Sequence, residues 1–293
     1  MKKQPKEFSM NTYDLSNNNI PAHLIRIINA IQEILKDKAY DFMLIGASAR
    51  DVVLTAIHGQ RSGRLTRDVD FALYIPEWNY YSTIMDELAL SGQFARTNVP
   101  HRLMFNETDE IDIVPFGEIQ NEAGNYLWPP ENIKSMTVAG FREISEHSLT
   151  IRLTEPSLQF KVASIPGICI MKLFAWSDRK YTDTRDGKDI GFIIANYIEL
   201  KWDILYEQYA DIVEDAEFHT VSSSARILGR EIFYLLHTNR LALQAVIDIL
   251  KQEINDPDNS RLAIAMTQGG IAGYLLAFKS LAQLFRGIND KSL

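Results

Sequence analysis

Residues 42–51 read FMLIGASARD, and residues 68–75 read DVDFALYI. In the first segment a short apolar run stops at Gly46, which predicts a buried strand, a tight turn and then a helix over 47–57. The second segment opens with polar and apolar residues in alternation and is rich in β-branched and aromatic side chains, which predicts another strand. This part of the chain therefore combines short strands with helices.

Similar patterns extend on both sides of these segments. Strands are predicted over 102–105 and 110–115, with the turn signal NETD between them, and a helix is predicted over 77–90. From Ile168 onward apolar positions recur at helical spacing almost throughout. We therefore expect an α+β fold in three parts, which are a flexible N-terminal segment over 1–20, a mixed α and β domain over 21–165 and an all-helical domain over 166–293.

Composition limits the function classes. The 293 residues include 46% apolar and 23% charged residues, which is typical of a soluble globular protein. The single cysteine, Cys169, excludes an intramolecular disulfide and a cysteine-built zinc site. The net charge of −8 argues against coating nucleic acid by bulk charge. Because we find neither a secretory signal nor an apolar run of about 20 residues, we expect a cytoplasmic protein with no membrane partner.

Three carboxylates lie in or beside predicted strands. Asp68 and Asp70 are separated by one residue, and residues i and i+2 of a strand point to the same face. Asp112 lies between Ile111 and Ile113 in another predicted strand. Neighbouring carboxylates repel unless a positive charge neutralises them, and their oxygens suit Mg²⁺, which leaves coordination positions for phosphates. If the strands are neighbours, the three acids form a candidate metal site; the alternative is a set of solvated acids, the commoner use of Asp-x-Asp.

The turn at Gly46 is a second candidate binding element. Glycine allows a tight turn and the close approach of a ligand, and the backbone N–H groups of a helix start, together with the Ser48 hydroxyl, suit a phosphate. The stretch is not a P-loop, because no Gly-Lys-Ser/Thr follows, and it lacks the further glycines of a dinucleotide fingerprint. Strand–glycine–helix turns also occur in α/β proteins without a ligand.

Together these parts resemble the signature of the DNA polymerase β-like nucleotidyltransferase superfamily: Gly46 with Ser48, then Asp68-x-Asp70, then Asp112 in a later strand. The sequences in and around these motifs are most similar to the nucleotidyltransferase AbiEii/AbiGii toxin family of type IV toxin–antitoxin and phage-defence systems. The segments that carry the resemblance are GASARD, RLTRDVDFA, HRL, IDIVPFGEI, WPP and MKLFAWSDRKYTDTRDGKDIGFII. It covers residues 40–198, a little over half of the chain.

The resemblance implies a small mixed β-sheet nucleotidyltransferase core with packed helices, followed by the helical domain. It also implies transfer of a nucleoside monophosphate from an NTP to an acceptor hydroxyl, with release of pyrophosphate. Asp68 and Asp70 would hold one or two Mg²⁺ ions, and Asp112 would complete the metal site and assist deprotonation of the acceptor. Gly46 and Ser48 would hold the β- and γ-phosphates.

The same resemblance assigns roles to four residues of the helical part. Lys172 and Lys188 would neutralise charge on the triphosphate or on the leaving pyrophosphate. Arg179 would stand with them in the nucleotide site, and Asp189 would orient a lysine or contact the acceptor. The implied partners are a nucleotide, an RNA acceptor and a cognate antitoxin.

Two other functions stay open. An enzyme of this fold could modify a small molecule, as in antibiotic adenylylation, and an acidic chain with no evident basic groove suits that slightly better than a large RNA. The other is a non-catalytic module that binds a nucleotide or a partner, and it predicts that Asp68→Ala leaves function intact.

Two features near the acids are ambiguous. Arg61, Arg64 and Arg67 would either grip an RNA backbone or a triphosphate, or form a solvated basic loop. His101 would either relay a proton or be a plain exposed side chain, and the second is favoured.

Overall fold

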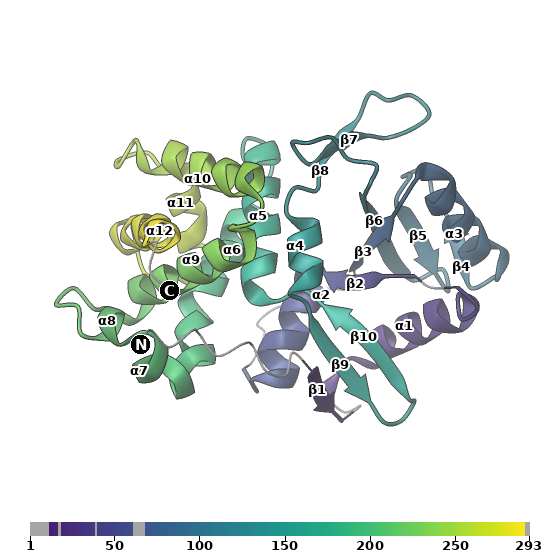
Figure 1. Cartoon of the computed structure of the whole chain (residues 1–293), viewed down its shortest axis with the longest axis horizontal. Helices are drawn as coiled ribbons and strands as arrows, with labels where there is room; N and C mark the ends of the chain where they lie inside the picture. Colours follow the sequence, from purple (N-terminus) through teal and green to yellow (C-terminus); the bar gives the residue numbers. More distant parts are fainter. Residues whose placement is uncertain (1–11, 17–18, 39, 61–67, 291–293) are drawn as a thin grey trace. The chain divides into compact units, whose positions relative to one another are not determined.

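The computed structural model describes residues 12–16, 19–38, 40–60 and 68–290. It confirms an α+β protein, with a mixed sheet in the first part of the chain and helices after it (Figure 1). The chain divides into two compact units, residues 1–164 and 165–293, beside the boundary that the sequence predicts. Within the described ranges, every helix is too short or too polar to cross a lipid bilayer.

The first unit is built on an eight-stranded mixed sheet in the order β1-β9-β10-β2-β3-β6-β5-β4. Its central strands β3 and β6 run parallel, and β2 runs antiparallel to β3. A separate hairpin pairs β7 with β8. The strands are β1 (Thr12–Leu15), β2 (Phe42–Ile45), β3 (Val69–Ile75), β4 (Phe94–Arg96), β5 (Arg102–Phe105), β6 (Asp109–Gly117), β7 (Asn125–Leu127), β8 (Ser135–Thr137), β9 (Leu149–Leu153) and β10 (Leu158–Val162).

β1 lies in the segment that the sequence predicts to be flexible. Its residues 12–15 pair in parallel with residues 150–153 of β9. The prediction of flexibility over 1–20 is therefore wrong for this strand, because the edge of β9 supplies backbone hydrogen-bond partners that no local pattern reveals. Residues 1–11 and 17–18 lie outside the described part of the chain.

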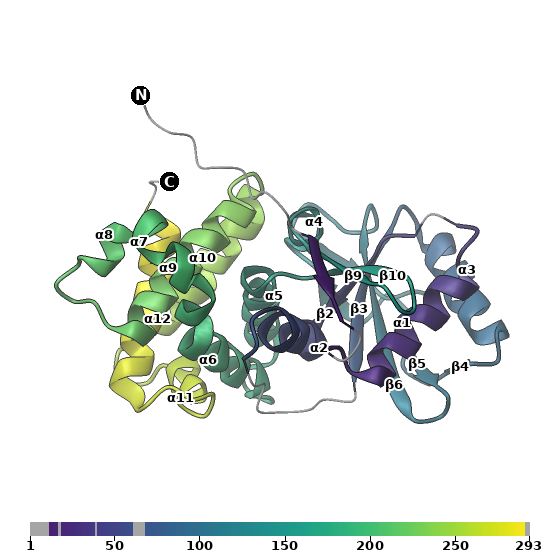
Figure 2. The same cartoon turned by 90° about the horizontal axis from the view of Figure 1, so that it is seen from below.

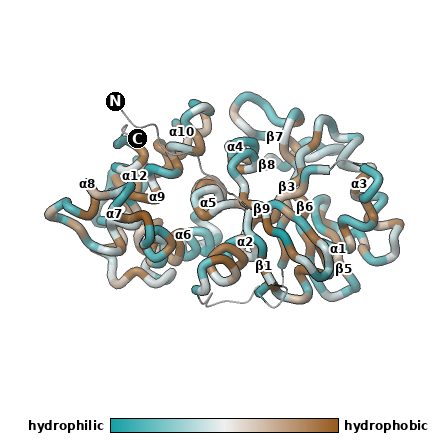
Figure 3. Tube along the Cα trace, turned by 60° about the horizontal axis from the view of Figure 1, so that its bottom comes forward, coloured by the Kyte–Doolittle hydropathy of each residue, from teal (hydrophilic) through white to brown (hydrophobic). Residues whose placement is uncertain are grey.

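Helices cover both faces of the sheet. α1 (Ala22–Ile34) and α3 (Trp78–Leu90) lie on one side and α4 (Phe141–Glu146) on the other, as the two views show (Figures 1 and 2). On the α4 side, the ring of Phe116 lies 5.9 Å from that of Phe141. Hydrophobic residues, coloured brown, lie along strands of this sheet (Figure 3). Because side chains of a strand alternate between faces, a nearly continuous apolar strand such as β3 packs against both helical layers.

The second unit is helical in its described residues. α9 packs against α5, α6 and α12. Its contact with α12 is close at Gly229 and Gly287, where an added Cβ would lie 2.3 Å and 2.1 Å from backbone carbonyl oxygens of the other helix. The helices are α5 (Ile165–Arg179), α6 (Arg185–Tyr197), η3 (Ile198–Ile204), α7 (Leu205–Gln208), α8 (Ala210–Val213), α9 (Thr220–Leu236), α10 (Arg240–Ile254), α11 (Arg261–Thr267) and α12 (Tyr274–Asn289).

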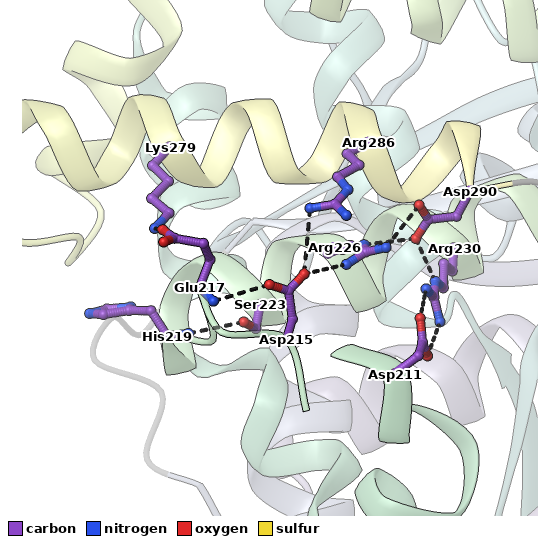
Figure 4. Close-up of polar contacts among 10 residues, drawn as sticks. All are labelled: Asp211, Asp215, Glu217, His219, Ser223, Arg226, Arg230, Lys279, Arg286 and Asp290. Atoms are coloured by element: carbon purple, nitrogen blue, oxygen red, sulfur yellow. Dashed lines mark hydrogen bonds and ion pairs between the residues drawn. The ribbon is translucent and has the colours of Figure 1, made fainter. Parts of the chain in front are cut away.

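An ion-pair cluster ties the end of α12 to α9 (Figure 4). Arg226 and Arg230, one turn apart on α9 and almost fully buried, both donate to Oδ2 of Asp290, at 2.8 Å and 2.7 Å. Arg226 also donates to Asp215, and Arg230 to Asp211. Each buried guanidinium is thus matched by carboxylates, as a charge buried at a helix interface requires.

Candidate active site

The turn after β2 lies against a carboxylate. Gly46 opens α2 (Gly46–Asp51) with a φ of +69°, in the left-handed region that favours glycine. A Cβ at this position would lie 2.2 Å from Oδ2 of Asp70, far inside van der Waals contact. Glycine therefore meets two requirements at once, the backbone angle and the close approach of Asp70.

The three predicted acids lie around this turn. Asp70 and Asp112 are register partners on the parallel strands β3 and β6, so their side chains leave the same face of the sheet. Asp68 directly precedes β3, and its backbone carbonyl accepts a hydrogen bond from Ser48 Oγ at 3.2 Å. Asp68 is exposed, whereas Asp70 and Asp112 are half-buried. The structure brings these acids, Gly46 and Ser48 to the start of β3.

Arg102 is bound to the third acid. It faces Asp112 across the β5–β6 pair, and its Nε and a terminal nitrogen donate to the two oxygens of Asp112 at 2.7 Å and 2.9 Å. A third guanidinium nitrogen contacts Glu110. The hydrogen bonds to Asp112 raise the pKa of Arg102, and the charges of Glu110 and Asp68 act in the same direction. Arg102 is therefore a permanent cation within the acid group.

His101 is buried behind Asp112, and the expectation that it is exposed was wrong. Only 8% of it is accessible; its ring lies 5.4 Å from that of Trp128, and its Nε2 lies 3.8 Å from Oδ2 of Asp112. Burial lowers the pKa of His101, although the charge of Asp112 opposes this. The cause of burial is an aromatic cover from α3 and β7, in which Trp78 and Tyr126 pack on Trp128. Such a cover depends on contacts distant in sequence.

Two buried nitrogens beside the acids have no hydrogen-bond partner among the described residues. They are Nδ1 of His101 and Nε1 of Trp128. A buried polar atom without a partner is costly, so atoms of this kind commonly have a water or a ligand group beside them. They mark the Asp112 side of the site as polar beneath its aromatic cover.

The acids fit a divalent cation in part. Across the described ranges, no three carboxylate, histidine or cysteine side chains are arranged as a metal site. At this position the two oxygens of Asp112 are bound to Arg102. Asp68 and Asp70 offer hard oxygen donors, and Mg²⁺ in proteins is commonly held by one or two carboxylates, with water and phosphate at its other positions. The pair fits Mg²⁺, whereas the charge of Asp112 is already matched by Arg102.

The predicted residues of the helical unit lie in α5 and α6. Lys172 Nζ lies 3.1 Å from an oxygen of Asp186 and 2.7 Å from one of Asp189. Arg179 donates two hydrogen bonds to Asp186, at 2.6 Å and 2.9 Å, and Asp186 is fully buried. Lys188 makes no side-chain ion pair with a described residue. Lys172, Arg179 and Asp189 thus form one ion-pair cluster centred on Asp186.

Burial and charge act against each other at Lys172. Desolvation lowers the pKa of its ammonium group, but Asp189 and Asp186 outweigh desolvation, and the net result is a raised pKa. The side chain is 18% exposed. A lysine in an apolar helix needs a partner or an anion, and here carboxylates of the neighbouring helix supply the partner.

Sequence reasoning missed the roles of Arg102 and Asp186. A hairpin whose turn is limited to the four residues NETD would pair Arg102 with Ile113. The structure instead turns through residues 106–108, with positive φ at Asn106 and Glu107, and pairs Arg102 with Asp112. A slip of one residue moves a side chain to the other face, so this contact depends on the exact register.

For Asp186 a signal was present in the sequence. It lies three residues before Asp189, a spacing that places both carboxylates on one face of a helix. The basic residues Arg61, Arg64 and Arg67 lie outside the described residues.

Comparison with known proteins gives no match: no family model, no curated protein and no solved structure matches this chain.

Proposed function

We propose that this chain is a Mg²⁺-dependent nucleotidyltransferase that transfers a nucleoside monophosphate from an NTP to an acceptor hydroxyl and releases pyrophosphate. The observation that carries the proposal is the packing of the Asp70 carboxylate against Gly46, with Asp112 beside it on the next strand. A glycine turn and carboxylates on one sheet face bring a phosphate-binding backbone and a cation-binding group together.

In this proposal Asp68 and Asp70 hold the cation. When bound, Mg²⁺ neutralises charge on the phosphates and on the leaving pyrophosphate. Gly46 lets the carboxylate of Asp70 lie against the turn, because a side chain at this position would clash with it. Ser48 donates to the backbone carbonyl of Asp68 and so helps to fix the position of that residue. The resemblance would also give Lys188 of the helical unit a role in neutralising phosphate charge.

The acceptor and the biological setting follow from the resemblance. Similarity to the AbiEii/AbiGii family favours an RNA acceptor, a toxin-like role in phage defence, a cognate antitoxin and a cytoplasmic location. Expression of the intact protein without an antitoxin should then slow growth, and Asp68→Asn/Asp70→Asn should relieve that effect.

Label transfer tests the proposal. Purified protein with Mg²⁺ is given each α-³²P-NTP in turn together with total RNA, and products are separated into RNA, protein and small-molecule fractions. We expect label in RNA, reduced about a thousandfold in Asp68→Asn/Asp70→Asn, since loss of one charge-stabilising group alone costs about a hundredfold or more. Asp37→Asn/Asp86→Asn, at two exposed positions of the same unit, has the same change in charge and should keep activity.

One observation favours a second function, nucleotide binding without transfer. Arg102 already satisfies Asp112, the acid expected to assist deprotonation. Under this alternative none of the four nucleotides labels any fraction, while calorimetry detects NTP binding that is unchanged in Asp112→Asn. Label in the small-molecule fraction alone would instead indicate the antibiotic-type enzyme.

A further inference from the structure

Arg102 forms a bidentate ion pair with Asp112. Nε and a terminal nitrogen of the guanidinium each donate to a different carboxylate oxygen, at 2.7 Å and 2.9 Å. This fork geometry makes an Arg–carboxylate pair stronger and more directional than a single charge-assisted hydrogen bond. The pair is also fixed by the backbone, because the two residues face each other across β5 and β6.

Arg102 has a second ionic partner, Glu110, which lies two residues before Asp112. Glu110 precedes Asp112 on the same face of β6, and its carboxylate already contacts the third guanidinium nitrogen. The side chain of Glu110 is 40% exposed, whereas that of Asp112 is 17% exposed. Arg102 could therefore leave Asp112 and keep an ionic partner, by a side-chain movement toward solvent.

A cation on the neighbouring acids would act on this pair. Asp70 and Asp112 are adjacent across β3 and β6, so a cation held by Asp68 and Asp70 lies on the same sheet face as the guanidinium. Like charges in one half-buried site repel. The carboxylate of Asp112 has two possible positive partners, the guanidinium and the cation, and these repel each other.

We propose that Arg102 competes with the divalent cation for Asp112, so that this third carboxylate joins the cation only when Arg102 swings to Glu110. The proposal rests on the metal site of the proposed function. It adds that Arg102 keeps Asp112 from serving as a ligand of that site. A guanidinium released from Asp112 keeps planar paired donors, which suit the oxygens of a triphosphate. Nucleotide and cation should then favour each other's binding.

Binding of Tb³⁺, a hard cation that prefers oxygen ligands, tests the competition without any assay of activity. Terbium luminescence sensitised by nearby aromatic side chains is titrated in the full chain, and Mg²⁺ is then used to displace the Tb³⁺. Signal from this site is the part lost in Asp68→Asn/Asp70→Asn. We expect Arg102→Met to raise the affinity of this site about tenfold, near the lower end of what a hydrogen bond to a charged group contributes.

A second background separates competition from simple charge removal. Arg102→Met also removes a positive charge that repels any cation nearby, whether or not Asp112 is a ligand. In an Asp112→Asn background the competition is absent but the charge effect remains. We therefore expect the gain from Arg102→Met to fall below about twofold in that background. Arg96→Met, on β4 and paired with Asp86, is the matched control for charge and should change Tb³⁺ affinity little.

Each result decides the proposal. A tenfold gain that disappears in the Asp112→Asn background supports it. An equal gain in both backgrounds, or no gain in either, overturns it. Arg102→Lys, which keeps the charge but loses the fork, should give an intermediate gain and serves if Arg102→Met does not fold. Label transfer is measured separately, so failure of the competition and failure of the proposed enzyme are distinguishable.

Discussion

The acids at the start of β3 and the acids of α6 differ in how they are enclosed. Asp186 is fully buried, and with Asp189 it is matched by the lysine and arginine of α5. Asp68 is exposed and Asp70 is half-buried. Both groups are carboxylates that lie close together in the sequence, at positions 68 and 70 and at positions 186 and 189. Their enclosure in the structure separates them.

This difference in burial favours different roles for the sheet acids and the acids of α6. The ion-pair cluster of α5 and α6 has a fully buried carboxylate at its centre, and its charges are matched within the cluster, so its contribution is to the stability of the helical unit. Carboxylates that reach solvent beside a glycine turn can bind a cation and release it. We therefore propose cation binding for the sheet acids and a stabilising role for the pairs that Lys172 makes.

The largest expected effect on stability comes from Lys172→Met. The substitution leaves Asp189 without this ammonium group and leaves the buried Asp186 with Arg179, whose side chain is 46% exposed. We expect the free energy of unfolding in urea to fall by about 3 kcal/mol, the cost of breaking a buried ion pair from one side. Lys251→Met, at an exposed position of α10, should change it by less than about 0.5 kcal/mol. A loss in Lys172→Met no greater than in the control would refute the stabilising role.

Gly46→Ala tests the other group of acids, because it changes the contact between the glycine turn and Asp70. The new Cβ would meet Oδ2 of Asp70 at 2.2 Å and would hold a φ of +69°, so the carboxylate must move. We expect a loss of about 2 kcal/mol of unfolding free energy and weaker Tb³⁺ binding. Gly59→Ala is the matched control, because Gly59 has a φ of +68° with nothing within 4 Å of the added Cβ. It should show only the cost of the backbone angle, about 1 kcal/mol, and unchanged Tb³⁺ binding.

The smallest expected effect is a dependence of stability on pH through His101. Burial lowers its pKa below the ordinary 6.5, with Lys134 and Arg102 acting in the same direction and Asp112 against it. As pH falls below about 6.5, the unfolded chain gains a proton that the folded protein does not, so stability is lost. His101→Phe keeps the ring beside Trp128 and removes this proton. Urea unfolding between pH 7 and 5 should then show a smaller decline, by up to about 1 kcal/mol. An unchanged decline would show that His101 is protonated normally in the fold.

Local sequence patterns were sufficient to predict most of the fold and to place the sheet acids in or beside strands. The run that stops at Gly46 and the alternation around Asp70 are properties of a few adjacent residues, and both strands form where they are predicted. β1 could not be predicted this way, because its partner β9 lies more than a hundred residues away. The pairing of Arg102 with Asp112 depends on a one-residue register, and the burial of His101 depends on rings from α3 and β7. Contacts between distant elements decided each of these outcomes.

The most direct test of the account compares label transfer from α-³²P-NTP in two variants at a temperature where both are folded by circular dichroism. We predict that Asp68→Asn/Asp70→Asn loses transfer about a thousandfold, while Lys172→Met stays within about threefold of the wild type. If Lys172→Met instead loses transfer as completely as the double aspartate variant, the lysine of α5 belongs to the reaction. The division of work between the two groups of acids would then be wrong.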